Sequence, residues 1–163
     1  MSATTQGREA YLSYARTGGP WTRVAKTAGR ATSTVRVWAW DYAHAADLPW
    51  PPLSPKQLHR KAMGLAGEAD AAEHGFGPPC PRAWAEAFAL ERHAAALSAG
   101  SQPAHAILCR SAAWLGIKAG EPAAGLAVAL AGLSAEAVPA SVGQELREAV
   151  TAATDALGEG GEE

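Results

Sequence analysis

Hydrophobic residues recur through most of the chain at intervals of three and four positions, the spacing that places them on one face of an α-helix. The pattern is clearest in a central segment, whose stripe comprises Leu58, Ala62, Leu65, Ala66 and Ala69. Strict alternation of β-branched or aromatic residues with polar ones, which a half-buried strand would show, is missing. The pattern therefore predicts an all-α protein.

Glycines and prolines set the expected ends of these helices. Gly100 and Gly120 stand where a left-handed residue ends a helix, and Pro55 stands at the first position of the central helix. We predict one helix starting at Pro55 and others over residues 6–17, 21–28, 32–44, 82–99, 103–119, 121–134 and 140–157.

Two proline-rich stretches, LPWPPLSP at 48–55 and GFGPPCP at 75–81, interrupt the helical pattern, because proline cannot continue a helix. They divide the chain into parts. We predict an N-terminal domain over residues 1–47, proline-rich linkers with a connecting helix over 48–81, a C-terminal helical domain over 82–157 and a disordered tail over 158–163.

The segment GPWTRVAKTAGRATSTVRVWAW, residues 19–40, predicts two helices joined by a very short turn. Helices joined so closely cross steeply, so the residues at the crossing must be small, and Ala25 and Gly29 meet that demand. Thr32 is placed to cap the second helix. The expected core of this three-helix unit comprises Tyr11, Leu12, Ala15, Trp21, Val24, Ala25, Ala28, Val35 and Trp38.

Within this segment, RVAKTAGRATSTVRVWA resembles the helix-turn-helix pattern VAxxxGxSxxTVxxW of bacterial and phage DNA-binding proteins. It is most similar to the subtype found in small terminase subunits and related mobile-element proteins. In that subtype a basic residue follows the turn glycine, as Arg30 does here, and tryptophans follow the second helix, as Trp40 and Trp50 do. The resemblance covers about residues 7–46.

The resemblance implies that residues 32–44 form a recognition helix in the DNA major groove. Thr32, Ser33 and Arg36 would then face the bases, with Arg36 able to bind guanine through two hydrogen bonds. Arg23, Lys26 and Arg30 would neutralise phosphates. Val37 is a further candidate for the side that faces the groove, but an outward face that includes Val37, Trp40 and Asp41 is more typical of a protein interface or of packing under another segment. Either the segment 45–53 covers Trp40, or this face binds protein.

The distribution of charge along the chain also favours DNA binding by the N-terminal segment. Residues 1–44 carry six basic side chains against two acidic ones, a balance of +4, whereas residues 45–163 carry eight basic and fourteen acidic ones, a balance of −6. A basic segment beside an acidic body indicates that the basic part meets polyanions. The six basic residues are Arg8, Arg16, Arg23, Lys26, Arg30 and Arg36.

The stretch AILCRSAAWLGIKAGEPAAGLAVALAGL, residues 106–133, predicts two closely packed antiparallel helices, because small residues recur on both. These small residues are Ala112, Ala113, Gly116, Gly125, Ala129 and Gly132. The stretch resembles a tetratricopeptide repeat, although the position of that repeat's large aromatic holds Cys109. The resemblance implies binding of a protein partner or self-association. A generic alanine-rich bundle is the alternative.

Catalysis is not expected from this sequence. Cys80 and Cys109 have no metal or redox spacing, the histidines are scattered, and no phosphate loop or nucleophile–base pattern is found. Glu91, Arg92 and His93 are interpreted as surface residues of a helix. No cofactor and no metal are expected. No apolar run approaches the roughly 20 residues of a membrane span, and MSATTQGREA is unlike a signal peptide, so we expect a cytoplasmic protein without a membrane partner.

The sequence thus predicts a non-enzymatic DNA-binding protein, either a transcriptional regulator or a phage or mobile-element DNA-recognition factor. Its partners would be double-stranded DNA and, through the C-terminal helices, a protein or a second copy of the chain. The alternative is a protein–protein adaptor that does not bind DNA.

Overall fold

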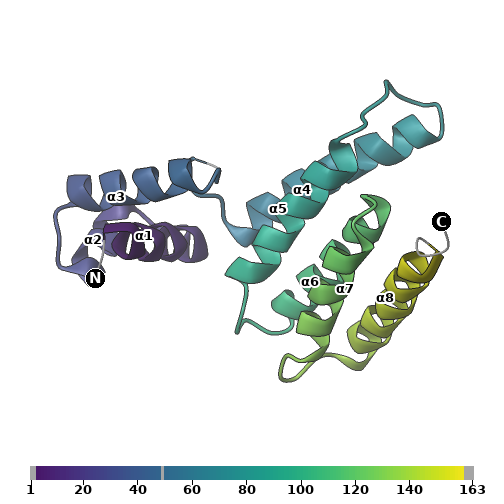
Figure 1. Cartoon of the computed structure of the whole chain (residues 1–163). Coiled ribbons are helices and arrows are strands. Elements are labelled where there is room, and N and C mark those ends of the chain that lie inside the picture. The colour runs from purple at the N-terminus through teal and green to yellow at the C-terminus, as the bar shows by residue number, and fades with distance from the viewer. Residues whose placement is uncertain (1–2, 49, 160–163) are drawn as a thin grey trace. The chain divides into compact units, whose positions relative to one another are not determined.

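The computed structural model describes residues 3–48 and 50–159, and its backbone confirms the predicted all-α class. Over these residues it contains eight helices and no strand (Figure 1). They are α1 (Ala3–Thr17), α2 (Trp21–Ala28), α3 (Thr32–Ala45), α4 (Pro55–Glu73), α5 (Ala83–Leu97), α6 (Ala104–Lys118), α7 (Pro122–Leu133) and α8 (Ala140–Glu159).

The helices form two compact units, residues 1–56 and 57–163. The segment 48–81, predicted as linkers with a connecting helix, is shared between them: its first residues belong to the N-terminal unit, and nearly all of α4 belongs to the C-terminal unit. Of the tail predicted to be disordered, residues 158 and 159 are the end of α8, and 160–163 lie outside the described residues.

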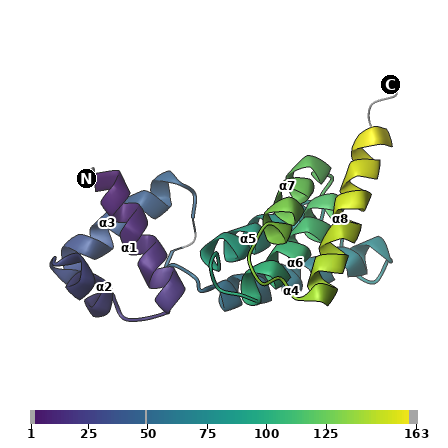
Figure 2. The same ribbon diagram turned by 90° about the horizontal axis from the view of Figure 1, so that it is seen from below.

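The N-terminal unit is built on the packing of α1 against α3, with α2 crossing below them (Figure 2). Its buried core comprises Ala10, Tyr11, Val24, Ala25, Val35, Ala39 and Ala43, with Leu12, Tyr14, Trp21, Tyr42 and Leu48 packed around it. α1 and α3 approach so closely that a Cβ atom on Gly7 would overlap the carbonyl oxygen of Trp38. Only glycine fits at this position.

The turn between α2 and α3 contains three residues. Gly29 adopts the left-handed conformation with φ of 62°, and the Arg30 N–H donates to the Ala25 carbonyl oxygen at 3.1 Å. Two local expectations were wrong. Ala31, not Thr32, occupies the cap position and Thr32 lies in the first turn of α3, while Ala28 is exposed at the end of α2.

The C-terminal unit stacks α5, α6, α7 and α8, each turning back on the one before it (Figure 1). Gly120 has φ of 74° and directly follows the cap of α6, as predicted, whereas Gly100, with φ of 82°, lies two residues beyond Ser98, which caps α5. Between α6 and α7 the backbones nearly touch, since a Cβ on Gly125 would lie 2.8 Å from the Ala113 carbonyl oxygen. The small residues predicted at this helix pair therefore permit its close packing.

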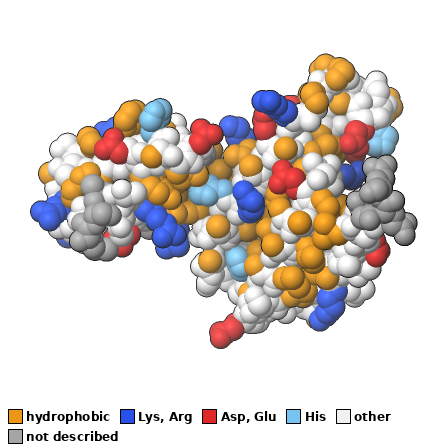
Figure 3. All heavy atoms as spheres, viewed as in Figure 1, with side chains coloured by type: hydrophobic (Ala, Val, Ile, Leu, Met, Phe, Trp, Pro, Cys, Tyr) orange, Lys and Arg blue, Asp and Glu red, His pale blue; other side chains and the backbone are white. Residues whose placement is uncertain are grey.

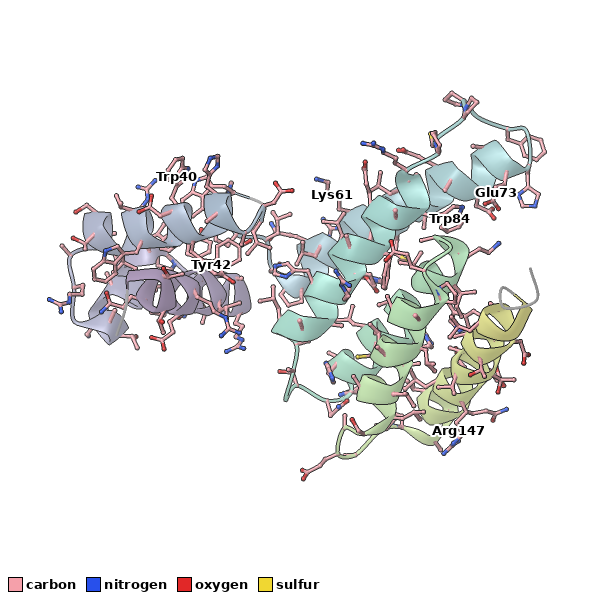
Figure 4. All side chains as sticks on the ribbon, in the orientation of Figure 1. Trp40, Tyr42, Lys61, Glu73, Trp84 and Arg147 are labelled. Carbon is pink, nitrogen blue, oxygen red and sulfur yellow. The ribbon has the colours of Figure 1, made fainter. Side chains whose placement is uncertain are left out.

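The helix α4 packs on this stack with the stripe predicted from the sequence. Leu58, Ala62 and Ala69 are buried, and Leu65 and Ala66 pack against the cluster around Phe88 of α5. Polar contacts hold its far end: the Trp84 indole N–H donates to Glu73 Oε1 at 2.6 Å, and Lys118 Nζ of α6 lies 3.8 Å from Glu73 Oε2 (Figure 4). α4 is thus part of the bundle.

The close approach of α6 and α7 can be tested by adding one methyl group. We expect Gly125→Ala to lower the free energy of unfolding by about 1–3 kcal/mol, because the new Cβ meets backbone that must shift. Gly67→Ala is the matched control: it lies inside α4 with nothing within 4 Å of an added Cβ, and we expect a gain of about 0.5–1 kcal/mol from helix propensity. Urea unfolding of both variants measures this, and equal effects would contradict the packing described.

Candidate nucleic-acid interface

The exposed face of α3 is defined by residues three, four and seven positions apart. Val35, Ala39 and Ala43 are buried against α1 and α2, so the opposite side of the helix meets solvent. Figure 4 shows Trp40 projecting from α3 away from α1, while Tyr42 points toward it. The residues of this exposed face that line one common hollow are Ser33, Arg36, Val37 and Trp40.

Of the six residues predicted to contact DNA, five are exposed and Thr32 is half-buried. Arg23 and Lys26 lie on the outer side of α2, away from the buried Val24 and Ala25. Ser33 and Arg36 are brought together at the hollow on α3. The six are therefore distributed over α2, the turn and the first turns of α3.

Arg30 lies apart from that pair. It lines a different hollow, on the side of α1, together with Glu9 and Gln6. Among the described residues of the N-terminal unit, no carboxylate lies within ion-pairing distance of Arg23, Lys26, Arg30 or Arg36; the ion pairs found are all in the C-terminal unit. Within the described part of the chain, these cationic groups thus form no ion pair.

The hollow on α3 has a volume of about 400 Å³ and is lined by Ser33, Arg36, Val37, Trp40 and Trp50. Its apolar side chains are open to solvent: Val37 is 56% exposed, Trp40 47% and Trp50 37%. The first of the two alternatives for Trp40 is therefore wrong, since the segment after α3 does not cover it. Instead that segment adds Trp50 to the same hollow.

Both tryptophan rings of the hollow are held by stacking. The Trp40 ring stacks on His44 at 5.2 Å between centroids, one turn further along α3. Trp50 stacks on Trp21 at 5.5 Å, and Trp21 stacks on Tyr14 of α1 at 4.2 Å. These ring contacts could not be predicted from the sequence, because spacing along the chain does not show which rings from different segments meet.

Asp41 lies on another part of α3. It lines a separate hollow with Thr4, Trp38 and Tyr42, and it is not among the residues that line the hollow of Arg36. An acidic side chain near phosphates weakens binding to DNA, and Asp41 is exposed one helical turn beyond Val37, so it opposes a phosphate contact at that part of α3.

The C-terminal unit contains a polar cluster that sequence reasoning missed. Glu91 was expected at the surface but is fully buried, with its Oε1 2.8 Å from Nδ1 of His59 on α4. Desolvation raises the pKa of the Glu91 carboxyl, and His59, Ser111 and Arg110 oppose that rise. Since His59 lies 32 positions earlier in the chain, no local pattern could have indicated the pair. It joins α4 to α5.

The buried thiol of Cys109 is not suited to nucleophilic chemistry. Its Sγ lies 3.6 Å from Nε2 of His105, but burial raises the pKa of the thiol to about 11, so it is protonated at neutral pH. His105 Nδ1 lies 2.9 Å from the Ala95 carbonyl oxygen, which fixes its ring. Over the described residues, no three His, Cys, Asp or Glu side chains are grouped so as to hold a metal ion.

No family model, no curated protein and no solved structure matches this chain. Within the part of the chain that the structure describes, none of the helices combines the length and apolar character needed to cross a membrane.

The burial of Glu91 predicts a particular dependence of stability on pH. Because the pKa of Glu91 is raised, the folded protein binds the proton of this carboxyl more tightly than the unfolded chain does, where the pKa of the group is 4.5. The contribution of Glu91 to the free energy of unfolding therefore falls as pH rises from 4.5 through the raised pKa. Glu91→Gln does not titrate, so we expect its stability relative to the wild type to improve over this pH range. Urea unfolding at a series of pH values measures the difference, and parallel pH profiles would contradict it.

Proposed function

We propose that the N-terminal unit binds double-stranded DNA as a helix-turn-helix, with α3 as the recognition helix. The observation that carries the proposal is the exposed first half of α3, where Ser33 and Arg36 stand at one surface hollow directly after a three-residue turn. Hydrogen-bond donors on the N-terminal part of such a helix reach base edges, while the preceding helix crosses the DNA backbone.

The cationic groups around α3 support this proposal. Arg23 and Lys26 project from α2 and Arg30 from the turn, and none has an acidic partner among the described residues. Unpaired cations on one small unit attract phosphates, and each contact adds affinity that falls with salt. In the proposal these three bind the backbone, whereas Arg36, Thr32 and Ser33 face bases or nearby phosphates.

The biological role proposed is transcriptional regulation or recognition of phage or mobile-element DNA. It rests on the resemblance of residues 24–38 to the helix-turn-helix of small terminase subunits and related proteins. A single unit of this size binds weakly alone, so we propose that the C-terminal unit brings two copies together and thereby places two recognition helices on one DNA.

The surface of α7 supports self-association. All twelve residues of this helix lack a polar side chain, and hydrophobic side chains gather over it in the space-filling view (Figure 3). Its solvent-facing stripe comprises Ala123, Ala127, Leu130 and Ala131. A helix that is apolar on all sides is normally covered, and the small residues of this stripe permit a second α7 to approach closely.

A protein–protein adaptor remains the competing function, and the exposed Val37 and Trp40 are the observation that favours it. Apolar side chains on an exposed helix face are typical of protein interfaces. Binding of DNA distinguishes the two functions directly.

The DNA-binding proposal predicts salt-dependent association of the full chain with fluorescent duplex DNA. We expect Lys26→Ala to reduce the slope of log affinity against log salt by about 1, because one phosphate contact is lost. Arg36→Ala should weaken binding to a preferred duplex about tenfold or more and reduce discrimination between sequences. Fluorescence anisotropy at several salt concentrations measures both effects.

Arg147→Ala is the matched control for these variants, since Arg147 is exposed on α8 in the other unit (Figure 4). It should leave affinity and salt slope unchanged. Absence of salt-dependent binding by the wild type would refute the proposal and favour the adaptor. Binding that Lys26→Ala weakens but Arg36→Ala does not would retain DNA binding and refute base contact by Arg36.

Self-association predicts that a charge on α7 separates the copies. Leu130 is 51% exposed, so Leu130→Glu leaves the fold intact but places an unpaired carboxylate in the proposed contact. Sedimentation velocity should show a dimer or larger assembly for the wild type and a monomer for the variant. The control is Leu157→Glu, at a comparably exposed leucine of α8, which should not change the assembly. A monomeric wild type would contradict the proposed contact.

A further inference from the structure

We propose that the hollow on α3 reads the 5-methyl group of thymine in the major groove, with Val37 as the contacting residue. This inference rests on the proposed DNA binding and assigns it a base preference. It gives a role to Val37 and Trp40, which belong neither to the core nor to the phosphate-binding set.

The position of Val37 places it at the centre of the proposed reading face. It follows Ser33 by four residues, precedes Trp40 by three, and lies opposite the buried side of α3. A side chain that far from the core approaches the floor of the groove first. In the major groove, thymine is the base that presents a methyl group, and apolar side chains recognise it by contact.

The chemistry of the hollow favours DNA over a protein helix as its occupant. The described polar residues of its lining are Ser33 and Arg36, and the acidic residue of α3, Asp41, lies one turn beyond Val37 and outside this lining. Thymine offers an O4 acceptor beside its methyl group, and a neighbouring guanine offers N7 and O6, so donors beside an apolar wall match the pattern of a base step. The unpaired Arg23 and Lys26 on α2 add charge complementarity with the phosphates.

The tryptophan walls of the hollow stack on neighbouring rings. The Trp50 ring is held through Trp21 by Tyr14, and Trp40 stacks on His44. A methyl group entering the hollow therefore meets apolar ring surface, and its burial there is favourable.

The test removes only the methyl group from the DNA. Duplexes preferred by the full chain are selected from a random pool, and the best one is then prepared with uracil in place of thymine, first throughout and then at single positions. We expect about three- to fivefold weaker binding for uracil at one or two positions, as burial of one methyl group implies. Uracil elsewhere in the duplex should have no effect.

Val37→Ala links this effect to the hollow. Val37 is exposed, so its truncation does not remove core packing, and we expect the variant to lose most of the preference for thymine, because the shorter alanine leaves most of the methyl group uncovered. The matched control is Leu157→Ala, an exposed hydrophobic residue of α8 that should retain the full preference for thymine.

The outcomes separate this inference from the proposed function. If no duplex binds in a salt-dependent manner, DNA binding fails and the thymine contact fails with it. If the wild type binds in a salt-dependent manner but uracil weakens binding at no position, DNA binding stands and the thymine contact is refuted. If Val37→Ala keeps the full preference for thymine over uracil, the methyl group is read elsewhere and the assignment to this hollow is refuted.

Discussion

The close approach of α1 to α3 determines which side of α3 is available for binding. Gly7 allows it, since any Cβ at this position would overlap the carbonyl oxygen of Trp38. Once the helices are this close, Val35, Ala39 and Ala43 are enclosed and the register of α3 is fixed. Ser33, Arg36, Val37 and Trp40 then share the outer face. A larger residue at position 7 would force the helices apart and disturb this register.

In the C-terminal unit too, glycines allow two helices to pack closely. Gly116 and Gly125 bring α6 and α7 into backbone contact, and the side chains of α5 and α8 close the core around them. Both units are therefore held by helices whose separation is set by glycine or alanine at the crossing. Bulky residues such as Phe88 and Leu146 fill the spaces that remain.

The positions of the helices could be predicted from the sequence because local signals determine them. Gly29 and Gly120 end helices through their left-handed conformations, and the apolar stripe of α4 requires only helical periodicity. The predicted ends agree with the structure to within a few residues. By contrast, Thr32 was misplaced by one position, since a threonine beside the first turn can occupy either the cap or the turn itself.

Contacts between distant segments were not predictable from a single sequence. Nothing local distinguishes Glu91 from its exposed neighbour Arg92, and its burial depends on His59 in another helix. The role of Trp50 likewise depends on Trp21, which lies 29 positions away. The candidate basic residues were identified from their pattern, but the hollow that brings Arg36 together with Val37 and two tryptophans was visible only in three dimensions.

The tryptophans around this hollow also give the protein a built-in optical signal. Four of its six tryptophans, at positions 21, 38, 40 and 50, belong to the N-terminal unit. Trp40 and Trp50 are partly open to water, and indole emission shifts to shorter wavelength when water is displaced. Occupancy of the hollow by any ligand therefore changes the intrinsic fluorescence of the unlabelled chain. The aromatic residues that line the surface thus also report when it is occupied.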